Sequence, residues 1–197
     1  MSRHSLIGSR RIDEILSAVG EQLASRGAQF ELVVIGGSAL QALGLIQRAT
    51  ADVDVVALVK QGRLTLANPL PKELASATEQ VARDYDLPPN WLNAGPTELL
   101  QFGLPEGFEG RVERRAYGPA LTVLFAGRLD QIHFKLYAMV DQGAGRHEAD
   151  LRSLNPSAEE LLMAARWART QDPSEGFRGE LLAALRYLGV PDADIGP

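Results

Sequence analysis

The first sixty residues show two different spacings of apolar side chains, one helical and one extended. Residues 9–27 have helical spacing and carry one apolar stripe, made of Ile12, Ile15, Leu16, Val19 and Leu23. Residues 30–35, FELVVI, form a short apolar run rich in β-branched side chains, which is typical of a strand covered on both faces. A second run of this kind occupies residues 55–59. The patterns predict one helix and two strands of a buried sheet.

Between the two strands, Gly36-Gly37-Ser38 interrupts the apolar pattern. Two successive glycines let the backbone turn tightly and come close to a ligand, and Ser38 is placed to cap a short helix that begins at Ala39. Such a turn offers a phosphate amide donors and the positive end of a helix dipole. We therefore expect Gly36, Gly37 and Ser38 to form a phosphate-binding turn.

The middle of the chain continues the alternation of helix and strand. Residues 60–68 have the pattern of a loop, and Pro71 begins a second amphipathic helix that extends to about Asp86. Residues 111–117 and 121–126 are strand candidates separated by a glycine-proline break. The order strand, helix, strand, helix predicts an α/β arrangement in layers.

The stretch from Leu87 to Gly110 lacks any clean period, because it is rich in proline, glycine and asparagine. A loop of this length inside a compact domain is commonly functional or mobile. Two interpretations stay open for it, a structural cover held by Trp91 and a lid over a substrate.

Helical patterns return in the last third of the chain. Asp130 is expected to open a helix that has Lys135 near the edge of its buried face. Ser157 and Glu160 have the spacing of a capping box at the start of a later helix, and a final helix is expected over residues 173–188. Three successive helices predict a small helical part that follows the sheet.

The length of 197 residues suits one domain with a helical appendage. We expect a core at residues 1–128, with the long loop near 87–110, and a helical C-terminal part at 129–197 packed on that core. The composition, 45% hydrophobic and 23% charged, is ordinary for a globular protein. The net charge of -5 argues against a broad nucleic-acid-binding face, because phosphate contacts need clustered Lys and Arg.

Two further features concern chemistry and compartment. The chain has no cysteine, which excludes thiolate metal sites. The first eleven residues, MSRHSLIGSRR, have no apolar signal core, and no later run reaches the length of a membrane span. We expect a cytoplasmic protein without a membrane partner.

Two carboxylates stand just before the second buried run, at Asp52 and Asp54. Side chains two positions apart in a strand point to the same face, so both carboxylates project together. Side by side they repel each other unless a cation lies between them. An ordinary solvent-exposed strand end is the alternative, but a carboxylate pair directly before a buried run is costly without a partner. We interpret the pair as a magnesium site beside the phosphate-binding turn.

Taken together, Gly36-Gly37-Ser38, Arg48-Ala49-Thr50 and Asp52-Val53-Asp54 resemble the signature of the DNA polymerase β-like nucleotidyltransferase superfamily. Within it, the chain is most similar to the minimal AbiEii-like group, which includes toxins of type IV toxin-antitoxin systems and uncharacterised relatives. There the resemblance extends to Lys135, Arg146 and Asp150. It implies an α+β nucleotidyltransferase fold, a mixed sheet flanked by helices and followed by a small C-terminal helical part.

The resemblance also implies a reaction, the transfer of a nucleoside monophosphate from an NTP to an acceptor hydroxyl. Two Mg²⁺ ions held by Asp52 and Asp54 would serve the attacking and leaving oxygens. The turn at Gly36, Gly37 and Ser38 would bind phosphates. Lys135 could reach the triphosphate as a mobile point charge, and its alternative role is to extend from a helix flank to solvent.

The remaining candidates are Arg48 and the residues that could supply a third carboxylate. Arg48 could bind the nucleotide, or orient a carboxylate or the turn. Many members of the superfamily have a third carboxylate on a later strand, and residues 121–126 contain none. Glu113 is the nearest substitute, whereas the AbiEii-like resemblance assigns this share of the site to Asp150. Ser153 replaces a further aspartate of that group.

The sequence therefore predicts a magnesium-dependent nucleotidyltransferase with NTP as substrate. A tRNA end or a protein side chain could be the acceptor, and a cognate antitoxin is a possible partner. The alternative is a catalytically weak protein of the same fold that senses nucleotides or binds another protein. A purely structural domain would leave the paired aspartates unexplained.

Overall fold

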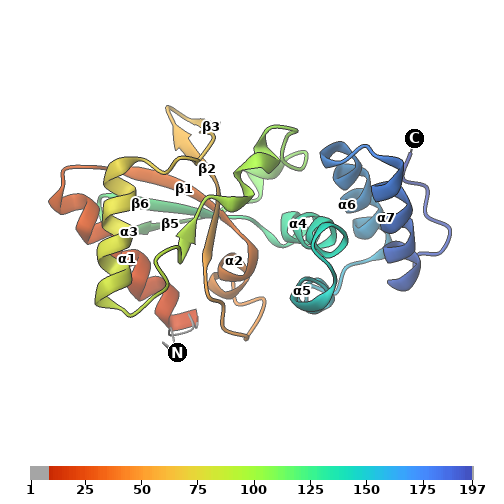
Figure 1. The fold of residues 1–197 in the computed structure, drawn as a ribbon, viewed down its shortest axis with the longest axis horizontal. Helices are drawn as coiled ribbons and strands as arrows, with labels where there is room; N and C mark the ends of the chain where they lie inside the picture. Colours follow the sequence, from red (N-terminus) through yellow and green to blue (C-terminus); the bar gives the residue numbers. More distant parts are fainter. Residues whose placement is uncertain (1–8, 197) are drawn as a thin grey trace. The chain divides into compact units, whose positions relative to one another are not determined.

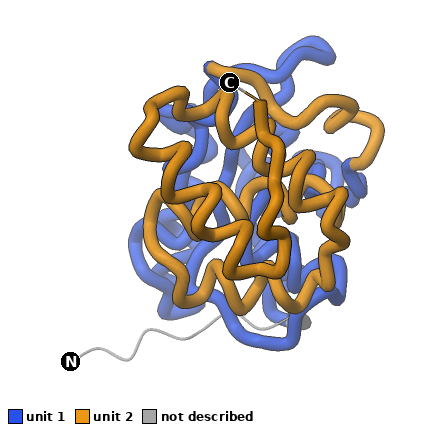
Figure 2. Tube along the Cα trace, turned by 90° about the vertical axis from the view of Figure 1, so that its right-hand side faces the viewer, with its two compact units in different colours: residues 1–101, 112–126 blue, residues 102–111, 127–197 orange. Residues whose placement is uncertain are grey.

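A computed structural model describes residues 9–196 (Figure 1), so the predicted lack of a signal core concerns residues that lie mostly outside the described part. Contacts divide the chain into two units, which Figure 2 shows in different colours. Unit 1 comprises Met1–Gln101 and Val112–Ala126, and unit 2 comprises Phe102–Arg111 and Gly127–Pro197. Among residues 9–196, no helix is long and apolar enough to cross a membrane.

Unit 1 is built on a mixed sheet in which six strands are formed by the described residues. The strands are β1 (Phe30–Ile35), β2 (Val53–Lys60), β3 (Arg63–Thr65), β4 (Leu92–Asn93), β5 (Glu113–Tyr117) and β6 (Leu121–Phe125). The sheet order is β3-β2-β1-β6-β5, and β4 pairs with β2. Strand β1 is antiparallel to β2 and parallel to β6. This mixed sheet with flanking helices confirms the predicted α+β fold class.

One face of the sheet is covered by α1 (Ser9–Ser25) and α3 (Lys72–Asp84) (Figure 1). The helical apolar stripe predicted for the first helix is fully buried in the core that α1, α3 and the sheet share. Gly27, with φ +66°, ends the α1 region in the left-handed conformation that glycine adopts readily. Burial of these apolar stripes is the main free-energy gain that holds the helices on the sheet.

The short helix α2 (Gly36–Ala42) begins three residues earlier than predicted. Ile35 occupies the N-cap position, and no side chain caps the helix, so the prediction of Ser38 as the cap is wrong. The reason is that Gly36, at φ +77°, makes the whole change of direction in one residue. Ser38 is therefore already inside the helix, where its hydroxyl lies 3.5 Å from the Ile35 carbonyl oxygen.

Two predicted loops contain short strands. In residues 60–68, Gln61 and Gly62 have positive φ angles and join β2 to β3 as a hairpin, so the prediction of a loop was wrong there. In residues 87–110, the structure has β4 and two short 3₁₀ helices, η1 (Gly95–Leu100) and η2 (Phe108–Gly110). Strands of two or three residues carry no detectable period, which is why sequence patterns missed them.

Trp91 anchors the first part of the 87–110 segment. Its side chain is buried, and its indole Nε1 donates a hydrogen bond to the Thr78 carbonyl of α3 at 3.0 Å. The Trp91 carbonyl in turn accepts from the backbone N–H of Val53 at 2.5 Å. For residues 87–101 these contacts favour a structural cover held by Trp91.

Besides η2, unit 2 contains four α-helices within the described residues, one more than the three predicted: α4 (Arg128–Asp141), α5 (Gly145–Ser153), α6 (Ala158–Gln171) and α7 (Glu175–Tyr187). Helix α4 starts two residues before the predicted Asp130, which is fully buried and bound by Arg111 at 2.6 Å. The predicted capping box of Ser157 and Glu160 is present at the start of α6. Trp167 packs edge-on against Phe134 and Tyr137 in the aromatic core of this unit.

Candidate functional site

The antiparallel pairing of β1 with β2 brings Asp54 to the turn that follows β1. Asp54 is the second residue of β2 and is paired directly with Ile35, the last residue of β1. Asp52 lies immediately before β2, and both aspartates are half-buried. The two carboxylates and the glycine turn thus belong to one corner of unit 1.

The carboxylate of Asp54 lies against the backbone of Gly36. A Cβ atom added at Gly36 would stand 2.7 Å from Asp54 Oδ2, a distance that side chains do not tolerate. Gly36 also has φ +77°, which strains any other residue. The positive φ angle requires glycine here, and the missing side chain also leaves room for the Asp54 carboxylate.

Gly37 faces the Arg48-Ala49-Thr50 segment. A Cβ atom at Gly37 would stand 3.1 Å from Thr50 Oγ1 and 3.2 Å from Arg48 Nη2. The buried Thr50 hydroxyl donates to Asp52 Oδ1 at 3.1 Å. Thr50 therefore connects the second glycine of the turn to the first of the two carboxylates.

The backbone of Arg48 is bonded to α2, which keeps this residue close to the turn. The side-chain amide of Gln41, on α2, donates to the Arg48 carbonyl oxygen, and Arg48 Nη1 donates to the Ala49 carbonyl at 3.3 Å. Gly36, Gly37 and Ser38 are buried, whereas Arg48 is half-buried. Among the unit 1 residues predicted to bind the nucleotide, Arg48 is the charged one.

Asn93 is a residue of the candidate site that was not predicted from the sequence. Parallel pairing of β4 with β2 sets Asn93 opposite Asp54, and Asn93 Nδ2 donates to Asp54 Oδ1 at 3.2 Å. Asn93 Oδ1 accepts from the backbone N–H of Gly95 at 2.8 Å. The spacing Asn-x-Gly in LNAGP was the available signal, since an asparagine that bonds the backbone two residues on is a common turn device.

Glu113 lies on the opposite face of the sheet from Asp54. Residues paired across strands share a face, and neighbours along a strand alternate. The register runs from Glu113 through Phe125 and Val34 to Val55, so Glu113 shares the face of Val55. Its carboxylate binds Arg115 at 2.6 Å. On the side away from β1, Asp54 is paired with β4, where Asn93 brings an amide in place of a carboxylate.

Lys135 and Asp150 form a buried ion pair in unit 2. Lys135 Nζ lies 2.7 Å from Asp150 Oδ2, with side chains 6% and 1% exposed. Lys135 thus does not extend to solvent from a helix flank, because α5 supplies its counter-charge inside the unit. Arg146, on the same helix, is exposed, and Ser153 donates its hydroxyl to the Ala149 carbonyl.

The oxygen donors of Asp52 and Asp54 suit Mg²⁺. Carboxylates are the ligands that this hard cation prefers, and Mg²⁺ is usually bound through one or two of them, with water and substrate phosphates completing the shell. Across residues 9–196 no group of three or more His, Cys, Asp or Glu side chains is placed to hold a metal. The donor set fits a cation that arrives with a phosphate ligand.

A pocket of about 500 Å³ adjoins this corner within unit 1. It lies between α3, the segment before β4 and η1, and its wall includes Thr78, Asn90, Asn93 and Glu98. Asn93 is thus shared by the pocket wall and the Asp54 carboxylate.

The fold is that of a nucleotidyltransferase-like α+β protein, and comparison with known families agrees. The chain belongs to the family described as "Nucleotidyltransferase of unknown function (DUF6036)", whose model matches residues 11–145. The matched range includes the glycine turn, both aspartates and Asn93. No curated protein and no solved structure matches the chain. Family membership supports the nucleotidyltransferase superfamily, while the similarity to the AbiEii-like group stays a prediction.

Proposed function

We infer that the protein is a magnesium-dependent nucleotidyltransferase that transfers a nucleoside monophosphate from an NTP to an acceptor hydroxyl. The observation that carries this inference is the Asp54 carboxylate beside the glycine turn at Gly36, with Asp52 two positions away, in a chain of a nucleotidyltransferase family. Asp52 and Asp54 would hold Mg²⁺. When bound, the ion neutralises charge that builds up on the phosphate oxygens.

The residues around the carboxylates have separable tasks in this proposal. The Thr50 hydroxyl fixes Asp52 by bonding its Oδ1. The other carboxylate oxygen of Asp52 would then face the cation. The backbone amides of Gly36 and Gly37, the Ser38 hydroxyl and the Arg48 guanidinium would bind the phosphates. Arg48 is the group best suited to stabilise the negative charge that develops on the leaving pyrophosphate, because an arginine guanidinium is always charged.

The roles implied for Lys135 and Asp150 remain predictions of the AbiEii-like resemblance. The same holds for a second Mg²⁺ ion, for a cognate antitoxin and for the cytoplasm as compartment. The acceptor is proposed to be a tRNA end or a protein hydroxyl. The net charge of -5 suits a protein acceptor about as well as a nucleic acid one.

The decisive test replaces both aspartates by asparagines, Asp52→Asn with Asp54→Asn, which removes two charges with little change of shape. The protein is incubated with each labelled NTP, Mg²⁺, bulk tRNA and cell lysate, and label is measured in the RNA and protein fractions. We expect the double variant to lose transfer activity by about a hundredfold or more. Mutating a residue that only hydrogen-bonds a metal ligand already reduces activity by up to about that factor.

The matched control is the pair Asp84→Asn and Asp86→Asn, also two positions apart and exposed at the end of α3. It should leave transfer unchanged. Labelling by the Asp52/Asp54 double variant at the control's rate would contradict the proposal. The labelled fraction identifies the acceptor class.

A nucleotide sensor of the same fold is the second candidate, and two observations favour it. The residue beside Asp54 on β4 is an amide, and the Asp150 carboxylate is already neutralised by Lys135 at 2.7 Å. A sensor should bind NTP and Mg²⁺ in a calorimeter and release no pyrophosphate in the presence of lysate. An enzyme should release pyrophosphate in proportion to the label transferred.

A further inference from the structure

The side-chain orientation of Asn93 is determined by its two hydrogen-bond partners. The Gly95 backbone N–H can only donate, so the atom that faces it at 2.8 Å must be the amide oxygen. The amide nitrogen is therefore the atom that faces Asp54 Oδ1 at 3.2 Å. A carboxylate accepts from this donor without gaining a charged neighbour.

The Asp54 carboxylate is bonded by Asn93 and lies in the space that the missing side chain of Gly36 leaves open. Asn93 engages Oδ1 from β4, and Oδ2 lies against Gly36, where a Cβ atom would stand only 2.7 Å away. A carboxylate whose Oδ1 is bonded to a fixed donor has less freedom to rotate, so its lone pairs keep preferred directions. Restraint of this kind lets a metal ligand bind without losing further conformational entropy.

We propose that Asn93 is a positioning residue, which orients the Asp54 carboxylate toward the divalent cation. This inference rests on the proposed function, because it gives Asp54 the part of a metal ligand. It adds a residue that lies 39 positions away in the chain and contacts the cation only through Asp54.

A purely structural role for Asn93, as a tie between β4 and β2, is the competing explanation. The attachment of β4 has independent support, however. The backbone N–H of Val53 bonds the Trp91 carbonyl at 2.5 Å, Leu92 pairs with Val53, and Trp91 is buried and bonded to Thr78. Truncating the Asn93 side chain should therefore leave β4 in place and release the carboxylate.

The chain offers two graded perturbations and a control. Asn93→Ala removes the amide altogether. Gly95→Ala keeps it but places a Cβ atom 2.9 Å from Asn93 Oδ1, which pushes the amide aside. Asn90→Ala truncates an exposed asparagine of the same segment that also borders the pocket.

The experiment is titration of each purified full-length variant with Mn²⁺ alone, with free Mn²⁺ measured by electron paramagnetic resonance. Thermal unfolding is followed in parallel. We expect about tenfold weaker Mn²⁺ binding by Asn93→Ala, as is usual when an outer partner of a metal ligand is lost. Gly95→Ala should weaken binding by a smaller factor, and Asn90→Ala should match the wild type.

The same titration of Asp54→Asn separates this inference from the proposed function. Tight binding by the wild type, loss by Asp54→Asn and wild-type affinity of both Asn93→Ala and Gly95→Ala would overturn the role of Asn93 alone. Equal Mn²⁺ affinity of the wild type and Asp54→Asn, or no binding by either, would overturn the metal site and with it the role of Asn93. A lower unfolding temperature of Asn93→Ala with unchanged affinity would assign Asn93 a purely structural role and would also overturn the proposal.

Discussion

At the scale of single residues, the site depends on glycines whose missing side chains make room for the protein's own polar groups. At Gly36 the space is used by the Asp54 carboxylate, and at Gly37 by Thr50 and Arg48. Glycine at position 36 thus has two effects: it allows the positive φ angle of the turn, and it leaves room for a carboxylate.

Gly36→Ala tests these two contributions against a matched glycine. Gly44 has φ +70° and nothing within 4 Å of an added Cβ atom, so Gly44→Ala measures backbone strain alone, about 1–2 kcal/mol. Gly36→Ala adds overlap with Asp54, and we expect it to lower the free energy of unfolding by about 1–3 kcal/mol more. Urea denaturation of both variants gives the difference. Equal values would mean that Asp54 moves away without cost.

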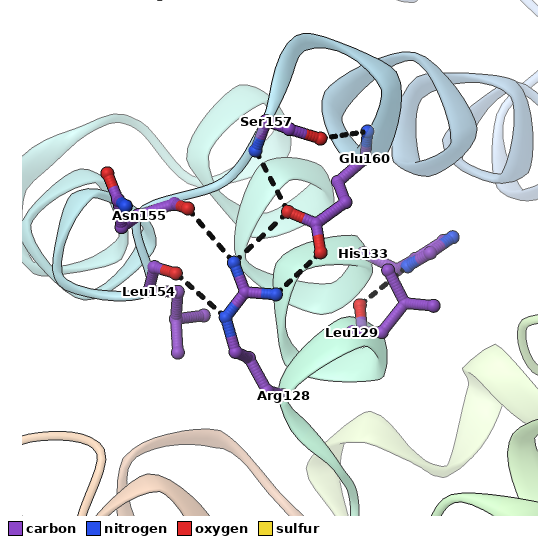
Figure 3. Close-up of polar contacts among 7 residues, drawn as sticks. All are labelled: Arg128, Leu129, His133, Leu154, Asn155, Ser157 and Glu160. Carbon is purple, nitrogen blue, oxygen red and sulfur yellow. Dashed lines mark hydrogen bonds and ion pairs between the residues drawn. The ribbon is translucent and has the colours of Figure 1, made fainter.

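At the scale of elements, Arg128 joins three helices of unit 2 (Figure 3). From the start of α4, its guanidinium donates to the carbonyls of Leu154 and Asn155, which directly follow α5, at 2.9 Å each. It also pairs with Glu160 Oε1 at 2.5 Å, while Glu160 closes the capping box with Ser157 at the start of α6. The hydrogen bonds from Arg128 lower the pKa of Glu160 below its ordinary value.

This contact predicts a pH-dependent contribution to the stability of unit 2. Because the pKa of Glu160 is lower in the folded state, its contribution is complete above the ordinary carboxyl pKa and is lost as the pH falls through the folded value. Glu160→Gln keeps a capping-box side chain but removes the charge. We expect it to cost about 1 kcal/mol at pH 7, since the pair is partly exposed, and less at pH 3.5.

Ser157→Ala is the comparison for that measurement. It removes the hydroxyl that accepts from the Glu160 backbone N–H at 3.1 Å, and a lost cap should cost about 1 kcal/mol at both pH values. Urea denaturation at pH 7 and pH 3.5 measures both variants. A Glu160→Gln effect that stays constant with pH would show that the charge pair with Arg128 adds nothing.

At the scale of the whole molecule, each unit has its own tryptophan. Trp91 lies in unit 1 and Trp167 in unit 2, and each indole N–H bonds a backbone carbonyl of its own unit at 3.0 Å. The protein has only these two tryptophans. Fluorescence of Trp91→Phe therefore reports on unit 2, and that of Trp167→Phe reports on unit 1.

Lys135→Met, made in each single-tryptophan background, tests whether the units differ in stability. It leaves the Asp150 carboxylate buried without its cation, which costs about 3–5 kcal/mol in comparable cases. We expect the urea midpoint reported by Trp167 to fall by more than the midpoint reported by Trp91. The control Lys72→Met removes an exposed lysine of α3 and should shift neither signal. Equal shifts by Lys135→Met would mean that the chain unfolds as one cooperative unit.

The length of an element and the sequence distance between its contacts decide whether the sequence alone reveals it. Helices α1, α3, α6 and α7 and strands β1, β5 and β6 were predicted because their apolar periods extend over several residues. Strands β3 and β4 were missed because two or three residues show no period. The start of α2 was misplaced because the choice between Gly36 and Ser38 as the turning residue depends on backbone angles that composition does not reveal.

The sequence by itself determined the glycine turn and the pair Asp52 and Asp54, because each depends on residues that are neighbours in the chain, and the α+β class followed from the family resemblance of these motifs. Only the tertiary structure decided that Asn93 bonds Asp54, that Asp54 lies against Gly36 and that Lys135 is neutralised by Asp150. Those contacts depend on strand register and helix packing. Register is set by the burial of whole strand faces and helix stripes, so it is a property of the assembled core and of no single segment.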